Sequence, residues 1–116
     1  MWKIVVKETF SAAHYLKKYR GRPEPLHGHN YRVEVHIASN SLNDEGITID
    51  FLEVKRYLKS ILPDRKFLND LYDFPTSAEN IAREIYRKMK ERYPTTVKVV
   101  LWETEDMGVE YEEEQG

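Results

Sequence analysis

The sequence predicts an α+β fold in a single domain, residues 1–116. Stretches in which apolar and polar residues alternate lie near both ends of the chain, and two amphipathic helical stretches lie between them. The expected order is therefore β-β-α-α-β-β, with two hairpins flanking two helices. At 116 residues, 41% of them apolar, the chain is long enough for one core and too short for a second domain.

The first hairpin is predicted from residues 1–9 and 31–39. Trp2, Ile4 and Val6 alternate with polar residues in the first stretch, and Tyr31, Val33, Val35 and Ile37 do so in the second. The connecting residues 15–26 indicate an electropositive loop, because they combine glycine and prolines with four basic residues. These are Lys17, Lys18, Arg20 and Arg22.

Two helices are predicted next. Asp50 is expected to cap the first, with Glu53 completing a capping box, and Pro63 to end it. Its apolar face is Phe51, Val54, Leu58 and Ile61. After a connection at 64–74, Thr76 or Ser77 is expected to cap the second helix, which Pro94 ends. Its buried stripe is Ile81, Ala82, Ile85 and Met89.

The second hairpin is expected at residues 97–102 and 109–111, with Val97, Val99 and Leu101 on one face of its first strand. Net charge is −2, from 18 basic and 20 acidic residues, which argues against nucleic-acid binding. There is no apolar run long enough to span a membrane, and the first residues do not resemble a signal peptide. We therefore expect a cytoplasmic protein with no membrane partner.

Four histidines and no cysteine define the available chemistry. His27 and His29, two residues apart, point to one side of a strand, and His14 supplies a third imidazole. Three histidines without a fourth protein ligand are typical of an open zinc site. The competing interpretation is that the His-x-His spacing is incidental, and His36, on the polar face, is expected to be an ordinary surface histidine.

Six motifs occur in order along nearly the whole chain: FSAAH (10–14), LHGHNY (26–31), IDF (49–51), FLND (67–70), TSAEN (76–80) and WET (102–104). Together they resemble the 6-pyruvoyltetrahydropterin synthase family, which includes the 6-carboxytetrahydropterin synthases of queuosine synthesis. The resemblance implies a tunnelling fold, a four-stranded antiparallel sheet with two helices on one face. It also implies that sheets join into a barrel in a homotrimer or homohexamer, with sites between subunits.

The same resemblance implies residue roles. Zn²⁺ would be bound by His14, His27 and His29, and the Glu103 carboxylate would hold the pterin ring of a small-molecule substrate. Ser77 falls near the start of the helix that contacts the pterin.

Two departures from the family pattern bear on the reaction. Pro23 stands where the family usually has a catalytic Cys, and Glu24 follows it, as in a subclass with Glu near this place. Where the family has an Asp-His pair, this chain has Asp64 and Arg65. Asp64 is kept as a candidate proton carrier. Arg65 is interpreted either as a phosphate contact or as a surface cation.

The resemblance to the Glu subclass implies a zinc-dependent lyase that converts 7,8-dihydroneopterin triphosphate to 6-hydroxymethyl-7,8-dihydropterin, on the way to folate-type pterins. Glu24 would act as the general base. One alternative is a 6-pyruvoyl- or 6-carboxy-tetrahydropterin synthase with rearranged acid–base groups. Another is a pterin-binding module without catalytic activity.

Overall fold

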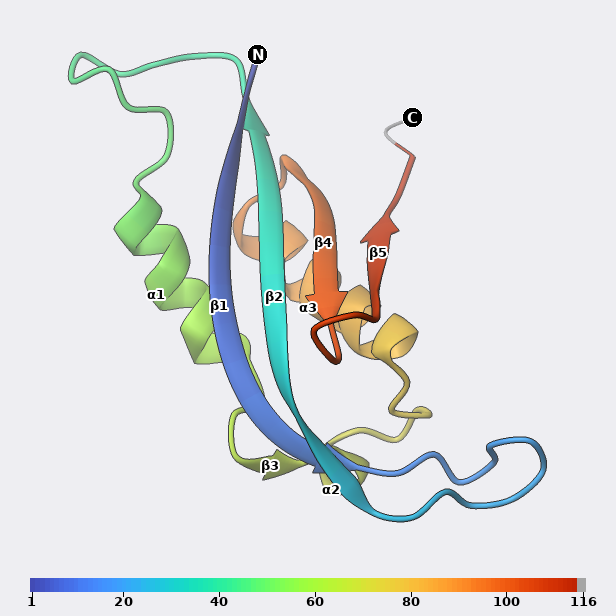
Figure 1. Ribbon diagram of the computed structural model, residues 1–116. Helices are drawn as coiled ribbons and strands as arrows, with labels where there is room; N and C mark the ends of the chain where they lie inside the picture. The colour runs from blue at the N-terminus through green and yellow to red at the C-terminus, as the bar shows by residue number, and fades with distance from the viewer. Residues whose placement is uncertain (115–116) are drawn as a thin grey trace.

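The structure, a computed structural model, describes residues 1–114. Its elements are β1 (Trp2–His14), β2 (His27–Ser39), α1 (Phe51–Ile61), β3 (Lys66–Phe67), α2 (Leu68–Leu71), α3 (Ala78–Arg92), β4 (Thr96–Trp102) and β5 (Gly108–Glu112). The described residues form a five-stranded sheet in the order β3-β1-β2-β4-β5. Helix α1 packs against β1, and α3 packs against β4 and β5 (Figure 1). Each of these helices contributes buried apolar residues to one core cluster, which also contains a single face of the sheet.

The predicted α+β class is confirmed, but the predicted four antiparallel strands and two helices are wrong in number. The difference lies in residues 64–74, which were expected to be a connection. There β3 pairs in parallel with β1, opposite Ala12 and Ala13, and α2 follows it directly. Arg65 has a left-handed backbone (φ 59°) and its N–H donates to the Ser11 carbonyl at 2.6 Å, which attaches this segment to the edge of β1.

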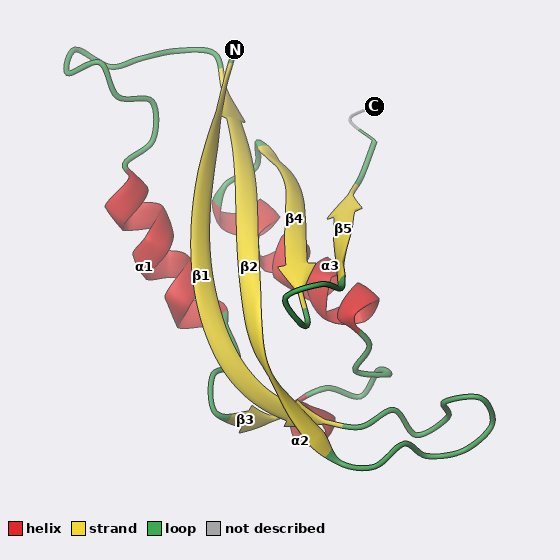
Figure 2. Cartoon of the chain, viewed as in Figure 1, coloured by secondary structure: helices red, strands yellow, loops and turns green. Residues whose placement is uncertain are grey.

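Strands β1 and β2 are longer than predicted and form a continuous antiparallel ladder. The ladder pairs His14 with His27 and Ala12 with His29, so the extension reaches the histidine motifs. Gly28 suits this close pairing, because a Cβ at that position would lie 3.3 Å from the Ala12 carbonyl oxygen, a tight contact. The loop between the two strands projects beyond the end of the sheet (Figure 2).

The helices bury most of the predicted residues. The predicted stripe of α3 is buried in full. In α1, Val54 and Leu58 are buried, but Phe51 is 62% exposed and is not part of the core as predicted, because it occupies the first position of the helix. Among residues 1–114, no helix is both long and apolar enough to cross a membrane.

The predicted helix caps are correct, but the capping box predicted for the first helix is not. The Asp50 carboxylate accepts from the Leu52 N–H at 2.9 Å, and the Ser77 hydroxyl accepts from the Asn80 N–H at 3.2 Å. Glu53 pairs with Arg92 of α3 at 2.6 Å instead of completing the first box. This contact joins the two long helices.

Strands β4 and β5 form the predicted second hairpin. Val97 is not buried as expected, because the register shifts between His36 and Ile37, and Thr96 rather than Val97 pairs with Ile37. Beyond this irregularity Val99 and Leu101 return to the core face. Glu103 follows the last residue of β4, and this places it at the same end of the sheet as the histidines.

Candidate metal centre

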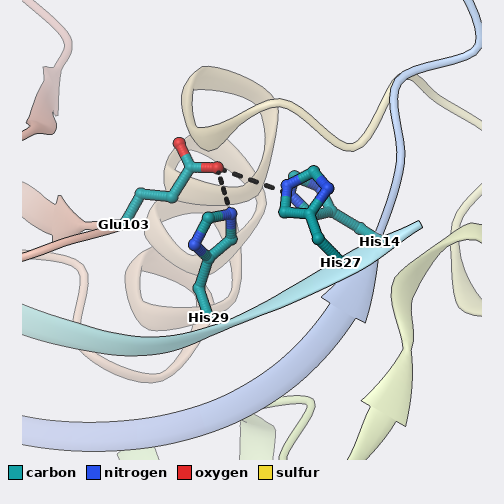
Figure 3. Close-up of side chains that lie close together, drawn as sticks. All are labelled: His14, His27, His29 and Glu103. Carbon is teal, nitrogen blue, oxygen red and sulfur yellow. Dashed lines mark ion pairs between the residues drawn. The ribbon is translucent and has the colours of Figure 1, made fainter. Parts of the chain in front are cut away.

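Three histidines and one glutamate converge at one end of the sheet (Figure 3). His14 ends β1, His27 and His29 begin β2, and Glu103 follows β4. One potential ligand atom from each lies within 4.8 Å of all the others. The sequence prediction that the three histidines come together is consistent with this arrangement, and the position of Glu103 beside them was not predicted.

Backbone carbonyls set the orientation of two of the imidazoles. His14 Nδ1 lies 2.8 Å from the Thr76 carbonyl oxygen, and His27 Nδ1 lies 2.7 Å from the Pro25 carbonyl oxygen. A carbonyl oxygen can only accept, so each Nδ1 carries the hydrogen and donates it. The Nε2 atoms are thereby left with a lone pair that faces the cluster, which is the arrangement that metal-binding histidines use.

The cluster fits a zinc ion. The Nε2 atoms of His14 and His29 are buried, and within the described part of the chain neither has a hydrogen-bond partner of good geometry. They nevertheless lie 3.3 Å and 2.8 Å from the same Glu103 oxygen. Buried polar atoms without a well-formed partner are costly, and a cation between them removes that cost. Imidazole nitrogens and a carboxylate oxygen are ligands that zinc binds readily.

The electrostatics of the cluster couple Glu103 to the histidines. Burial opposes the protonation of His14, but the Glu103 carboxylate and the Thr76 carbonyl outweigh it and raise the pKa of His14. Burial lowers the pKa of His29, and the neighbouring histidines add to this. The adjacent His14 imidazole lowers the pKa of Glu103, and His29 and His27 add to this. The site thus stabilises a carboxylate beside the imidazoles.

A hydrogen-bonded segment behind His14 holds its orienting carbonyl in place. Asn69 of α2 accepts from the Tyr15 N–H at 3.0 Å and donates to the Tyr15 carbonyl at 2.9 Å. The Thr76 side chain is buried and contacts His14 and Asn69. Sequence reasoning missed these two supporting roles. Both residues stand in the family motifs, but only the fold shows that the motifs meet at His14.

Glu24 lies beside the cluster. Its Oε1 accepts from the Leu16 N–H at 2.9 Å and is 3.9 Å from His27 Nε2. The Glu24 N–H donates in turn to the Leu16 carbonyl, so two backbone contacts fix the carboxylate across the loop. The structure therefore brings the sequence-predicted Glu24 next to the predicted metal ligands.

The remaining predicted residues are not part of the cluster formed by the three histidines and Glu103. Asp64 accepts from the Ser11 N–H at 2.9 Å, at the outer edge of β1. Arg65 lines a cleft of about 530 Å³ beside this edge, which Gly28 and His29 also line. Ser77 lines a second cleft of about 340 Å³ together with Tyr15, Lys17 and Lys18. This second cleft adjoins the Thr76 support of His14.

Exposure within the cluster shows from which side a ligand can enter. The side chain of His14 is 2% exposed, that of His29 16%, that of Glu103 29% and that of His27 36%. His14 therefore forms the floor of the site, and His27 and Glu103 form its rim. A small molecule that reaches the cluster meets the rim first.

Comparisons with a family sequence model and with curated proteins point to the same family. Residues 3–114 match the sequence model of the family described as 6-pyruvoyl tetrahydropterin synthase. A putative 6-carboxy-5,6,7,8-tetrahydropterin synthase from Archaeoglobus fulgidus is 33% identical over 109 residues, which covers 92% of each chain. The 6-carboxy-5,6,7,8-tetrahydropterin synthase of Synechocystis sp. is 36% identical over 100 residues, covering 78% of this chain and 77% of that protein.

Solved structures show the same fold. The 6-pyruvoyl tetrahydropterin synthase of Caenorhabditis elegans superposes with a TM-score of 0.83 at 21% identity, covering 97% of this chain and 96% of that one. A Plasmodium vivax 6-pyruvoyltetrahydropterin synthase, solved as a catalytic-residue mutant with Cys in place of Glu, gives a TM-score of 0.77 at 20% identity. It covers 97% of both chains.

Proposed function

Because the chain belongs to the 6-pyruvoyl tetrahydropterin synthase family, we propose that it is a zinc-dependent lyase that acts on 7,8-dihydroneopterin triphosphate and releases 6-hydroxymethyl-7,8-dihydropterin. The observation that carries the proposal is the position of Glu24, whose carboxylate lies 3.9 Å from His27 in a chain without cysteine. A fixed carboxylate at this place is the available proton acceptor. In the Plasmodium vivax synthase, too, a catalytic residue is a glutamate.

In this proposal His14, His27 and His29 hold the zinc ion, which supplies Lewis-acid polarisation of a side-chain hydroxyl of the substrate. Glu24 accepts the proton of that hydroxyl. The adjacent carbon–carbon bond then breaks as the hydroxyl carbon becomes an aldehyde, and the electron pair passes to the carbon attached to the pterin ring, where a proton replaces the lost fragment. Glu103 holds the ring, Ser77 and the lysine-lined cleft lie beside it, and the assembly is a homotrimer or homohexamer.

Asp64 and Arg65 keep a secondary place in the proposal. The Asp64 carboxylate accepts a hydrogen bond from the edge of β1, and this contact gives Asp64 a structural role that needs no part in catalysis. Arg65 remains a candidate contact for a substrate phosphate, because its guanidinium has a geometry suited to phosphate oxygens. Both roles stay predictions.

A second candidate is favoured by the names of two curated relatives. The Archaeoglobus and Synechocystis proteins are both named 6-carboxy-5,6,7,8-tetrahydropterin synthases, the first as putative. On this alternative Glu24 takes over proton transfer in a reaction that leaves only the first side-chain carbon on the ring, as a carboxylate.

The deciding experiment identifies the product. The zinc-loaded protein is incubated with 7,8-dihydroneopterin triphosphate, and the pterins formed are separated by chromatography and identified by mass spectrometry. We expect 6-hydroxymethyl-7,8-dihydropterin. A 6-pyruvoyl or 6-carboxy product would establish the alternative instead, and binding without turnover would identify a pterin-binding module.

The role of Glu24 is tested by Glu24→Gln, which keeps the size and the acceptor oxygen of the side chain. We expect turnover to fall at least about 100-fold, since general-base catalysis contributes 10²–10⁴-fold, with zinc content unchanged. Glu45→Gln, at an exposed carboxylate in a distant loop, is the matched control and should retain full activity. Turnover of Glu24→Gln equal to that of the control would remove Glu24 from the mechanism.

A further inference from the structure

Two roles compete for the Glu103 carboxylate: contact with the histidines and recognition of the pterin ring. In the structure its Oε1 is 2.8 Å from His29 Nε2 and 3.3 Å from His14 Nε2, where a metal ligand would lie. The resemblance assigns the same carboxylate to the pterin ring. Its second oxygen points away from the histidines (Figure 3).

The backbone at Glu103 is fixed by the turn between β4 and β5. The Glu103 N–H donates to the Met107 carbonyl at 3.0 Å, and the Thr104 hydroxyl accepts from the Met107 N–H at 3.1 Å. Gly108 allows the close approach, because a Cβ there would lie 2.6 Å from the Leu101 carbonyl oxygen. A change of position at Glu103 is therefore a rotation of its side chain and not a movement of the hairpin.

The two uses of the carboxylate exclude each other. Recognition of a ring that presents an amide and an amino group uses both carboxylate oxygens, one for each donor. An Oε1 that binds a metal ion has turned toward the histidine floor and is not available to the ring. The 29% exposure of the Glu103 side chain places it at the rim, where an arriving ring reaches it.

We propose that Glu103 is the fourth ligand of the zinc ion when no substrate is bound, and that the substrate ring draws the carboxylate away and so opens the fourth position for the substrate side chain. The inference rests on the proposed function, because it requires metal on the three histidines. It explains why Glu103 Oε1 is directed at the Nε2 atoms of His14 and His29, although recognition of the pterin ring needs both carboxylate oxygens. Four protein ligands close the site at rest, and three remain during the reaction.

The test uses Co²⁺ in place of zinc, because its visible absorption depends on coordination. The metal-free protein is titrated with Co²⁺ in the wild type, in Glu103→Gln, and in Glu105→Gln as the control from the same turn. We expect the Co²⁺ affinity of Glu103→Gln to fall by at least about 10- to 100-fold, the range found when groups that only support a metal site are lost, together with a changed absorption spectrum. Glu105→Gln should match the wild type.

Unsubstituted pterin, which lacks the reactive side chain, supplies a second readout. It should change the Co²⁺ spectrum of the wild type and weaken Co²⁺ binding, since binding linkage is reciprocal. It should do neither in Glu103→Gln. Circular dichroism of each variant establishes that the fold is retained.

The outcomes separate the two hypotheses. If His27→Ala loses Co²⁺ while Glu103→Gln binds it with wild-type affinity and spectrum, Glu103 is no ligand and the inference is wrong, although the metal site stands. An unchanged wild-type spectrum in saturating pterin would also overturn it. If the wild type binds no Co²⁺, the metal site of the proposed function fails and the inference fails with it.

Discussion

Single hydrogen bonds decide which atoms of the candidate centre face inward. The Thr76 and Pro25 carbonyls accept from the Nδ1 atoms of His14 and His27, so Nε2 is the atom of each ring that is left to face the cluster. His36 shows the contrast: its Nε2 bonds to Glu34 on the opposite face of the same strand. One sequence thus contains histidines in two settings, and their strand register separates them.

Metal content should therefore depend on His27 and not on His36. Replacing His27 with Ala removes a direct ligand at the exposed rim, so we expect zinc affinity to fall by more than about 100-fold, beyond the loss seen for supporting groups. His36→Ala removes an imidazole of the same size and should leave zinc bound. Zinc per chain is measured by elemental analysis after dialysis, and equal content in the two variants would contradict the three-histidine assignment.

At the scale of elements, regular patterns were predictable and short contacts were not. The stripe of α3 and the alternation in β2 are repeated several times, so the sequence shows them clearly. The two-residue β3 and the four-residue α2 are too short to repeat any pattern, and they form because the edge of β1 and the Tyr15 backbone offer them partners. Likewise the histidines were recognisable as a motif, whereas the support from Asn69 depends on tertiary contact.

The N-terminus of α3 gives a prediction at this scale. Ser77 caps the helix through the Asn80 N–H, so Ser77→Ala should lower the free energy of unfolding by about 1 kcal/mol. Ser60→Ala, at an exposed position in α1, serves as the control and should change it by less than about 0.5 kcal/mol. Urea denaturation of the metal-free proteins measures both. A loss at Ser77 below about 0.5 kcal/mol would show that the cap contributes little.

For the molecule as a whole, the charged groups predict how stability depends on pH. Hydrogen bonds and neighbouring cations lower the pKa values of Glu8, Glu34, Glu84 and Glu103 below the ordinary 4.5. A lowered carboxyl pKa contributes stability that is present above 4.5 and is lost as pH falls through the folded-state value. The raised pKa of His14 acts in the opposite sense: its contribution is present below 6.5 and is lost as pH rises.

We therefore expect the metal-free protein to lose stability steadily below pH 4.5, whereas near pH 6.5 the raised pKa of His14 and the lowered pKa of His29 act in opposite senses. The urea midpoint measured from pH 3 to pH 8 tests this. Glu34→Gln should flatten the acid side of the curve, because the carboxylate that His36 and Lys7 stabilise is then replaced by an amide, which does not titrate. A midpoint that rises toward pH 3 would contradict the assignment of the lowered carboxyl pKa values.

The link from His14 to Thr76 has a consequence for dynamics. Thr76 stands two residues before α3, so the imidazole at the floor of the centre is joined to the start of a helix that itself contributes no ligand. A metal ion that binds the folded centre stabilises every state in which that contact is closed. Amide hydrogens in the first turn of α3 should then exchange with solvent more slowly in the metal-loaded protein. Metal binding at the histidines would thus be detected as protection in a helix that lies far from them in the sequence.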